Sequence, residues 1–297
     1  EIASGFKAGV GFGLAYGAIW ACSGKVIESL RNMPWIVGAV DEKSMRTAKT
    51  ILSAISNEGV IEVDDIKVAE AIKIFESVYQ NVNLVLANEL AYYCERVGIN
   101  FLNVQRILNS QFDCRIPIPK VLGGHIISDP LLLLDEAEAL GIKLRLISIL
   151  RRANSDILRR IYYMVRSALR SCGKTIRRSR ITILGVSYQP NVREVKNTPT
   201  KRIVEILQRK GLLVRVYDPL FSIEELTEMG YPAERSLTRA VREADCLLIT
   251  VGHDEFKSLN LKRLRFLMRR PAAIIDLAYI LDRSDVESEG LIYYSLE

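Results

Sequence analysis

Three glycines near the start of the chain have a spacing that invites comparison with a dinucleotide-binding loop. Gly9, Gly11 and Gly13 alternate with other residues, and glycines at a helix start allow the backbone to approach a pyrophosphate closely. The run does not complete a Gly-x-Gly-x-x-Gly pattern, and the eight residues before Gly9 are too few for the strand that must lead into such a loop. Gly185 follows a strand pattern, but no second or third glycine comes after it. We therefore find no NAD-binding fingerprint in this sequence.

The two histidines lack the neighbours that a metal site requires. His125 follows two glycines, and His253 stands at the end of a predicted strand. No cysteine or second histidine lies at a short ligand spacing from either one, so we expect no bound metal. Cys114 lies eleven residues before His125, which leaves a Cys–His nucleophile pair open. We expect both histidines to be structural or to lie next to a ligand.

Two segments at the ends of predicted strands are better candidates for ligand binding. They are residues 185–191 and 217–219, and open α/β sheets bind ligands at the carboxyl ends of their parallel strands. Asp218 has a carboxylate that could accept a hydrogen bond from a sugar hydroxyl. A simple turn before Pro219 explains the same aspartate equally well.

The bulk composition is that of an ordinary globular chain. Its 297 residues are 49% hydrophobic and 26% charged, enough for about two domains. The apolar stretch 78–93 contains five polar residues, so no window resembles a membrane span. The five cysteines are odd in number and scattered, and the first residues resemble no export signal. We expect a cytoplasmic protein with reduced thiols.

The net charge of +6 is concentrated in one segment. Between Gly141 and Arg180, twelve lysines and arginines stand against the single acidic residue Asp156, so this segment carries all the excess positive charge. Arginines recur every seven residues within it, at 145, 152, 159 and 166. The stripe is either a solvated helix face, which is the commoner case, or an anion-facing surface.

The hydrophobic pattern predicts an α/β protein in three parts. Residues 1–65 have a strand, strand, helix, strand pattern. Residues 66–173 form a helical middle, with one helix over 66–97 and another over about 135–171 that is weakened at Gly141. On the second helix, one apolar face contains Leu146, Leu150, Ala153, Ile157, Ile161, Met164 and Ala168.

The last part of the chain, residues 174–297, alternates short strands with helices. The strand patterns cover residues 181–186, 212–217, 246–251 and 272–276. Strands that are separated by helices pair in parallel, so we predict a doubly wound parallel sheet.

With these patterns in place, the chain resembles the nucleotide-sugar dehydrogenases over essentially its whole length. Ala69-Glu70 with Lys73, followed by residues 83–91, is similar to the family's central helix. Gly123-Gly124-His125 with Asp129-Pro130 looks like the active-site loop of the UDP-N-acetylmannosamine dehydrogenases. The family's nucleotide-binding C-terminal domain is matched in order by Tyr188, Pro190-Asn191-Val192, Thr198-Pro199, Tyr217-Asp218-Pro219, residues 252–256 and Ile275-Asp276.

The resemblance implies an architecture, a reaction and a set of site residues. It implies a partial Rossmann-like domain over 1–65, a helical dimerisation domain over 66–173 and a UDP-sugar-binding domain over 174–297. Such enzymes oxidise a UDP-hexose to its uronate with NAD as cofactor. The retained catalytic residues would be Lys73 and Asp129. The substrate-binding residues would be Arg115, Gly123, Gly124, His125, Tyr188, Asn191 and Lys196.

The same comparison shows residues that depart from the family's pattern. Ile19 stands where the family has an acid/base glutamate, and Ser77 where it has an asparagine. Ile126 follows His125, where the family has its nucleophilic cysteine. Isoleucine can neither move a proton nor form a thioester.

Further replacements fall on groups that the family uses to bind its ligands. The family has Lys at the position of Gln189, and it has Arg at the positions of Lys196 and Ala278. The loop 117–122 is also shortened. Replacing an arginine that binds through two nitrogens is not conservative. The chain also begins after the family's glycine loop, which predicts that it does not bind NAD on its own.

Three interpretations follow. The first is an inactive homologue that keeps the fold, the helical homodimer and a UDP-sugar or UDP site. The second is an active enzyme completed by a separate NAD-binding chain, with Cys114 as the nucleophile. The third is a nucleic-acid or other anion-binding protein that uses the segment 145–180, although few aromatic residues lie among its arginines. We favour the first and expect neither a membrane nor a nucleic acid as partner.

Overall fold

The structure of the chain is a computed structural model that describes residues 1–21, 24–121 and 123–296, so Cys22 lies outside the described residues. The chain divides into two compact units. The first contains Glu1–Tyr79 and Asp129–Glu136, and the second contains Gln80–Ser128 and Ala137–Glu297. No helix in the described part is long and apolar enough to cross a membrane.

A three-stranded mixed sheet forms the centre of the first unit. Strand β2 (Trp35–Ala39) pairs antiparallel with β1 (Ala15–Ala18) and parallel with β3 (Val60–Val63). The strand, strand, helix, strand pattern is confirmed, with α2 (Glu42–Ser53) as its helix. A short helix that the sequence pattern does not predict, α1 (Val26–Asn32), lies between the first two strands.

The long central helix is present as predicted. Helix α3 covers Ile66–Val97, 32 residues without interruption. Its small residues Ala87 and Ala91 are fully buried, and Phe101 at the start of α4 (Phe101–Gln111) packs in the same apolar cluster.

The second long helical run is divided in two, which corrects the prediction of one run over 135–171. Helix α5 covers His125–Ala139, and α6 covers Arg145–Ser171. The break falls at Gly141, whose φ of +70° is left-handed and cannot continue an α-helix. The N–H groups of Gly141 and Ile142 instead bond back to Glu138 and Ala137, which closes the end of α5.

The predicted apolar face of α6 is buried along most of its length. Leu150, Ile157, Ile161, Met164 and Ala168 are buried, whereas Leu146 is 63% exposed because the first turn of the helix extends beyond the core. The arginines at 145, 152, 159 and 166 are all exposed.

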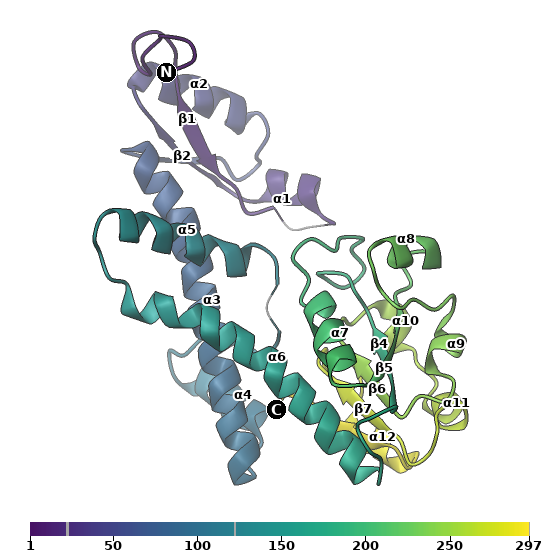
Figure 1. The fold of residues 1–297 in the computed structure, drawn as a ribbon. Coiled ribbons are helices and arrows are strands. Elements are labelled where there is room, and N and C mark those ends of the chain that lie inside the picture. The colour runs from purple at the N-terminus through teal and green to yellow at the C-terminus, as the bar shows by residue number, and fades with distance from the viewer. Residues whose placement is uncertain (22–23, 122, 297) are drawn as a thin grey trace. The chain divides into compact units, whose positions relative to one another are not determined.

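A five-stranded parallel sheet forms the C-terminal part of the second unit, as predicted (Figure 1). Its strand order is β5-β4-β6-β7-β8. The strands are β4 (Arg180–Leu184), β5 (Leu213–Tyr217), β6 (Cys246–Ile249), β7 (Ala273–Asp276) and β8 (Ile292–Tyr294). The last strand is an addition to the four that the pattern predicted.

Helices cover both faces of this sheet. On one face, α6 and α7 (Thr200–Arg209) pack on buried residues of β4, β5, β6 and β7. On the other face, α9 (Leu237–Val241), α11 (Leu261–Leu267) and α12 (Arg283–Ser288) close a second apolar cluster. The remaining helices, α8 (Ile223–Glu228) and α10 (Asp254–Lys257), follow β5 and β6.

Candidate functional site

The strand order of the C-terminal sheet creates a topological switch point between β4 and β6. The chain leaves β4 through α7 to reach β5 on one side, and it returns to β6 on the other side. The connections therefore diverge at the carboxyl ends of β4 and β6, which leaves a crevice. A cavity of about 660 Å³ opens there. Its walls include residues 187–190, 250–252 and 277–280, together with the loop 117–121.

A buried carboxylate holds the first wall of this cavity in place. Asp218 Oδ2 accepts hydrogen bonds from the backbone N–H of Val186 (2.7 Å) and of Ser187 (3.2 Å). Its Oδ1 accepts from the N–H of Leu220 at 2.9 Å. Asp218 is fully buried, so its role is to fix the strand ends rather than to contact a ligand. The turn interpretation of Asp218 is thus the one that the geometry supports.

His253 completes the same network from the end of the next strand. Its Nδ1 accepts from the Asn191 N–H at 2.9 Å, so Nε2 carries the proton and donates to Asp218 Oδ2 at 3.2 Å. Burial acts to raise the pKa of Asp218, but the hydrogen bonds from His253 and from backbone N–H groups outweigh it and lower the pKa. The imidazole ties the loop after β4 to the loop after β6.

Asp276 plays the corresponding part for the third wall. It is fully buried and accepts from the N–H groups of Ala278 (3.0 Å), Ile280 (2.8 Å) and Leu281 (2.9 Å). Burial raises the pKa of Asp276 despite these bonds. The backbone of 277–280 therefore keeps one shape along the cavity.

The two glycines before His125 pack against Tyr188. A Cβ at Gly124 would lie 2.6 Å from the ring of Tyr188, and one at Gly123 would lie 2.9 Å from the carbonyl oxygen of Asn197. Gly124 also has a φ of +64°, and its N–H donates to the same carbonyl at 3.2 Å. Only glycine fits both positions. Tyr188 and Gly123 line the cavity, so the structure brings these predicted residues together.

Polar groups of several kinds face the cavity. Lys120 and Lys257 are its basic side chains, and Thr250 and Tyr188 contribute hydroxyl groups. Lys257 is half exposed and pairs with Asp254 at 2.8 Å. Burial raises the pKa of Tyr188, with a further contribution from Glu194, so its hydroxyl stays protonated and can donate. Such a mixture suits a ligand that carries both phosphate and hydroxyl groups.

The other predicted binding residues lie elsewhere in the described part. Arg115, His125 and Lys196 are exposed and do not contribute to the cavity wall. Asn191 has a φ of +60° and bonds to His253 and to Asp254, which gives it a structural part in the loop.

The predicted catalytic residues Lys73 and Asp129 both belong to the first unit. Lys73 Nζ lies 3.4 Å from Oε2 of Glu76 and 5.3 Å from the centre of the Trp20 ring. Asp129 accepts a 2.7 Å hydrogen bond from Ser77. Each charged group is thus held by neighbouring side chains.

The sequence did not assign Lys257 or Thr250 to the site, and it gave Lys120 no role of its own. It did place Gln189, Ala278 and the loop 117–122 among the family's ligand-binding positions, and Gln189, Ala278 and residues 117–121 line the cavity. The signal available for Thr250 was its place near the carboxyl end of the predicted strand 246–251. The lysines could be found only once the loops had been placed beside one another, because no spacing rule links residue 120 to residue 257.

Gly11 and Gly13 are not arranged as a pyrophosphate-binding loop. A Cβ at Gly11 would lie 2.8 Å from Phe6, and one at Gly13 would lie 2.7 Å from Ser44, so these glycines pack against the chain's own side chains. They precede β1 rather than a helix. Gly185 is separated from α7 by fourteen residues. Within the ranges that the structure describes, no group of three His, Cys, Asp or Glu could hold a metal ion.

A parallel sheet with a polar pocket at its switch point defines a nucleotide-binding α/β domain. Two family models agree. Residues 182–283 match the UDP binding domain of the UDP-glucose/GDP-mannose dehydrogenase family, and residues 67–156 match the central domain of the same family. The chain therefore belongs to the UDP-glucose/GDP-mannose dehydrogenase family.

Similar proteins are UDP-N-acetyl-D-mannosamine dehydrogenases. The one from Methanocaldococcus jannaschii is 31% identical over 278 residues, 92% of this chain and 61% of that protein. The one from Methanococcus maripaludis strain S2 is 31% identical over 240 residues, 80% of this chain and 53% of that protein. The chain thus spans between half and two thirds of these relatives.

Solved structures of the same family share the fold. The structure of UDP-D-ManNAc dehydrogenase from Pyrococcus horikoshii superposes on this chain with a TM-score of 0.86 at 27% sequence identity. The match covers 99% of this chain and 66% of the chain in that structure. The native structure of UDP-N-acetyl-mannosamine dehydrogenase from Staphylococcus aureus has a TM-score of 0.81 at 25% identity, with the same two coverages.

Proposed function

We propose that this chain binds the UDP part of a nucleotide sugar at the switch-point cavity and does not oxidise the sugar on its own. The observation that carries the proposal is the cavity itself, about 660 Å³ in volume. Its walls at 187–190, 250–252 and 277–280 fall inside the segment that matches the UDP binding domain. The residues that hold these walls, Asp218, His253 and Asp276, are all buried and hydrogen-bonded.

The chemistry of the wall supports a diphosphate with hydroxyl groups. Lys120 and Lys257 supply positive charge, and lysine binds phosphate as a point charge. Tyr188 and Thr250 supply hydroxyl groups, although Thr250 already donates to the carbonyl oxygens of Leu184 and Gly185. A UDP-N-acetylhexosamine is the sugar nucleotide that the relatives suggest.

The proposed lack of oxidation rests on residues that replace the family's catalytic groups. Ile126, after His125, has no thiol for a covalent intermediate. Its carbonyl accepts from Asn81 at 2.7 Å, which holds this backbone in place. Ser77 bonds to Asp129, and Lys73 pairs with Glu76, so both retained charges are engaged. Ile19 carries no proton to transfer.

The experiment that tests the site is a calorimetric titration of UDP into wild-type protein and into Lys257→Gln. We expect binding to weaken by about two- to fivefold in the variant, because one half-exposed charge pair is lost. Lys262→Gln is the matched control, since Lys262 is an exposed lysine on the neighbouring helix that does not line the cavity. Equal affinities for all three proteins would place UDP elsewhere.

A further inference from the structure

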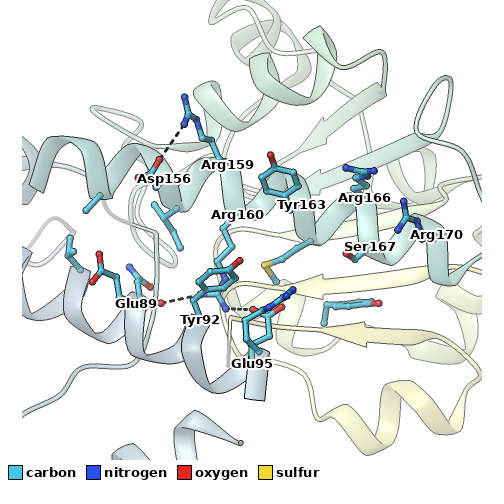
Figure 2. Close-up of a pocket in the computed structure, with 17 residues that line it drawn as sticks. Glu89, Tyr92, Glu95, Asp156, Arg159, Arg160, Tyr163, Arg166, Ser167 and Arg170 are labelled. Atoms are coloured by element: carbon cyan, nitrogen blue, oxygen red, sulfur yellow. Dashed lines mark hydrogen bonds and ion pairs between the residues drawn. The ribbon is translucent and has the colours of Figure 1, made fainter. Parts of the chain in front are cut away.

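A second cavity lies between α3 and α6, away from the nucleotide pocket. Its volume is about 680 Å³, and its lining residues come from 85–96 of α3, from 153–170 of α6 and from β8, which contributes Tyr294 (Figure 2). No residue lines both cavities. All of its lining residues belong to the second unit. We call it the arginine groove, because five arginines line it.

Only two of these arginines have an ion-pair partner in the described part. Arg160 pairs with Glu95 at 2.6 Å, and Arg159 pairs with Asp156 at 3.5 Å. The remaining guanidinium groups, those of Arg96, Arg166 and Arg170, have no hydrogen-bond or ion-pair partner among the described residues. The groove therefore keeps unneutralised positive charge.

This charge gathers at one end of the groove. Figure 2 shows Arg166, Ser167 and Arg170 together at one end, with Glu89 and Asp156 at the other. Arg166 and Arg170 are one helical turn apart on α6, and like charges at this spacing repel each other. The helix dipole offsets part of this repulsion for Arg170 in the last turn. An anion between the two guanidinium groups would remove the remaining repulsion.

The floor of the groove contains buried polar atoms that lack hydrogen-bond partners in the described part, which is a second indication of a ligand site. Arg160 is 9% exposed, and its guanidinium lies 5.0 Å from the centre of the Tyr92 ring. Its Nη1 donates to the carbonyl of Asn88, but its Nε and the Oδ1 of Asn88 have no partner in the described part. A buried donor and a buried acceptor without partners are costly. A polar group that reaches the floor would satisfy them.

We propose that the arginine groove binds a small organic phosphate. The phosphate lies between Arg166 and Arg170, where two guanidinium groups can each donate two hydrogen bonds to its oxygens. Ser167 adds a hydroxyl donor at the same end, and the half-exposed ring of Tyr163 faces the organic part of the ligand. A hollow of this size between two helices and a strand end suits a small molecule better than a long polyanion.

The test is a calorimetric titration of inorganic pyrophosphate into the full chain and two paired variants. One variant is Arg166→Gln with Arg170→Gln. Its matched control is Arg145→Gln with Arg152→Gln, which removes the same charge from exposed positions of the same helix outside the groove. We expect one site that weakens by about tenfold in the first variant, because two charge-assisted contacts are lost, and that stays unchanged in the control.

Several results would overturn the proposal. Pyrophosphate that does not bind at all rejects the site, and so does an equal loss in both variants. Single-stranded DNA that displaces pyrophosphate and depends equally on all four arginines would show a polyanion-binding helix face instead. Circular dichroism and the melting temperature establish that each variant is folded. Pyrophosphate binding that Lys257→Gln weakens and the groove variant leaves unchanged would place the ligand in the nucleotide pocket, which also contradicts the proposal.

Discussion

Asp218 is the residue on which the switch-point cavity depends most. Its carboxylate is fully buried and accepts hydrogen bonds from the backbone after β4, from the turn after β5 and from His253 after β6. A ligand-binding defect in an Asp218 variant would therefore reflect the shape of the site and not a lost ligand contact.

Asp218→Asn is expected to destabilise the second unit by about 3 kcal/mol, because an amide N–H₂ would face buried donors that need an acceptor. The folded-state pKa of Asp218 is lowered below its ordinary value, so its stabilising contribution is present above about pH 4 and is lost as the pH falls further. Thermal unfolding of wild type and variant against pH measures this, with exposed Asp113→Asn as control. A stability difference that widens as the pH falls would contradict the assignment.

Ile126 is the position at which catalysis can be tested most simply. Ile126→Cys places a thiol directly after His125, but Ile19 and Ser77 stay unchanged. We expect no NADH formation from UDP-N-acetylmannosamine and NAD⁺, either in wild type or in this variant. Turnover by the single variant, measured as NADH absorbance, would show that the other replacements are tolerated and would refute the inactive-enzyme account.

The roles of individual residues were harder to predict from the sequence than the secondary-structure elements or the fold. Gly123 and Gly124 pack on Tyr188, and Gly123 and Tyr188 line the cavity, while their part in ligand binding stays a prediction. Lys120 and Lys257 gave no such signal, since their significance comes from loops that only the fold brings together. Asp218 left two readings open, and its complete burial decides between them.

Among the elements, α3 has an apolar stripe that stays exposed among the described residues of the second unit. Leu86, Leu90, Tyr93 and Val97 are all at least 37% exposed, and their alternating spacing of four and three residues forms a seam that suits a second helix. A second copy of the same chain is the partner that we predicted, and an isologous dimer would pair this seam with itself.

Leu90→Glu with Tyr93→Glu is expected to convert a dimer into a monomer in sedimentation equilibrium, because two charges would be buried in the seam. Gln111→Glu, at an exposed position at the end of α4, is the matched control and should leave the mass unchanged. A wild-type monomer at all concentrations would reject the predicted homodimer.

The elements themselves followed from the sequence to a large extent. The 32 residues of α3 and the four main strands of the parallel sheet were predicted because uninterrupted periodicity and strand–helix alternation are strong signals. The division of α5 from α6 was missed, because one glycine does not reveal a left-handed backbone. The strand β8 has only three residues, too few for its alternation to stand out.

For the whole molecule, the fold and the family are established, while binding and turnover are the parts that we propose. Lys73 and Asp129 belong to the first unit, and the residues of the switch-point cavity belong to the second. The switch-point cavity has walls that are held by buried residues, and it has a polar lining. Most of its lining residues also lie in the segment that matches a UDP binding domain. The central claim is therefore that nucleotide binding persists without cofactor-dependent chemistry.

The most direct test of this claim is a calorimetric titration of the wild-type chain with UDP and with UDP-N-acetylmannosamine, each with and without NAD⁺. We expect both ligands to bind at one site, with affinities that NAD⁺ leaves unchanged. An absence of binding by both ligands would contradict a retained nucleotide site. A change in affinity on addition of NAD⁺ would show that this chain binds the cofactor, against our account.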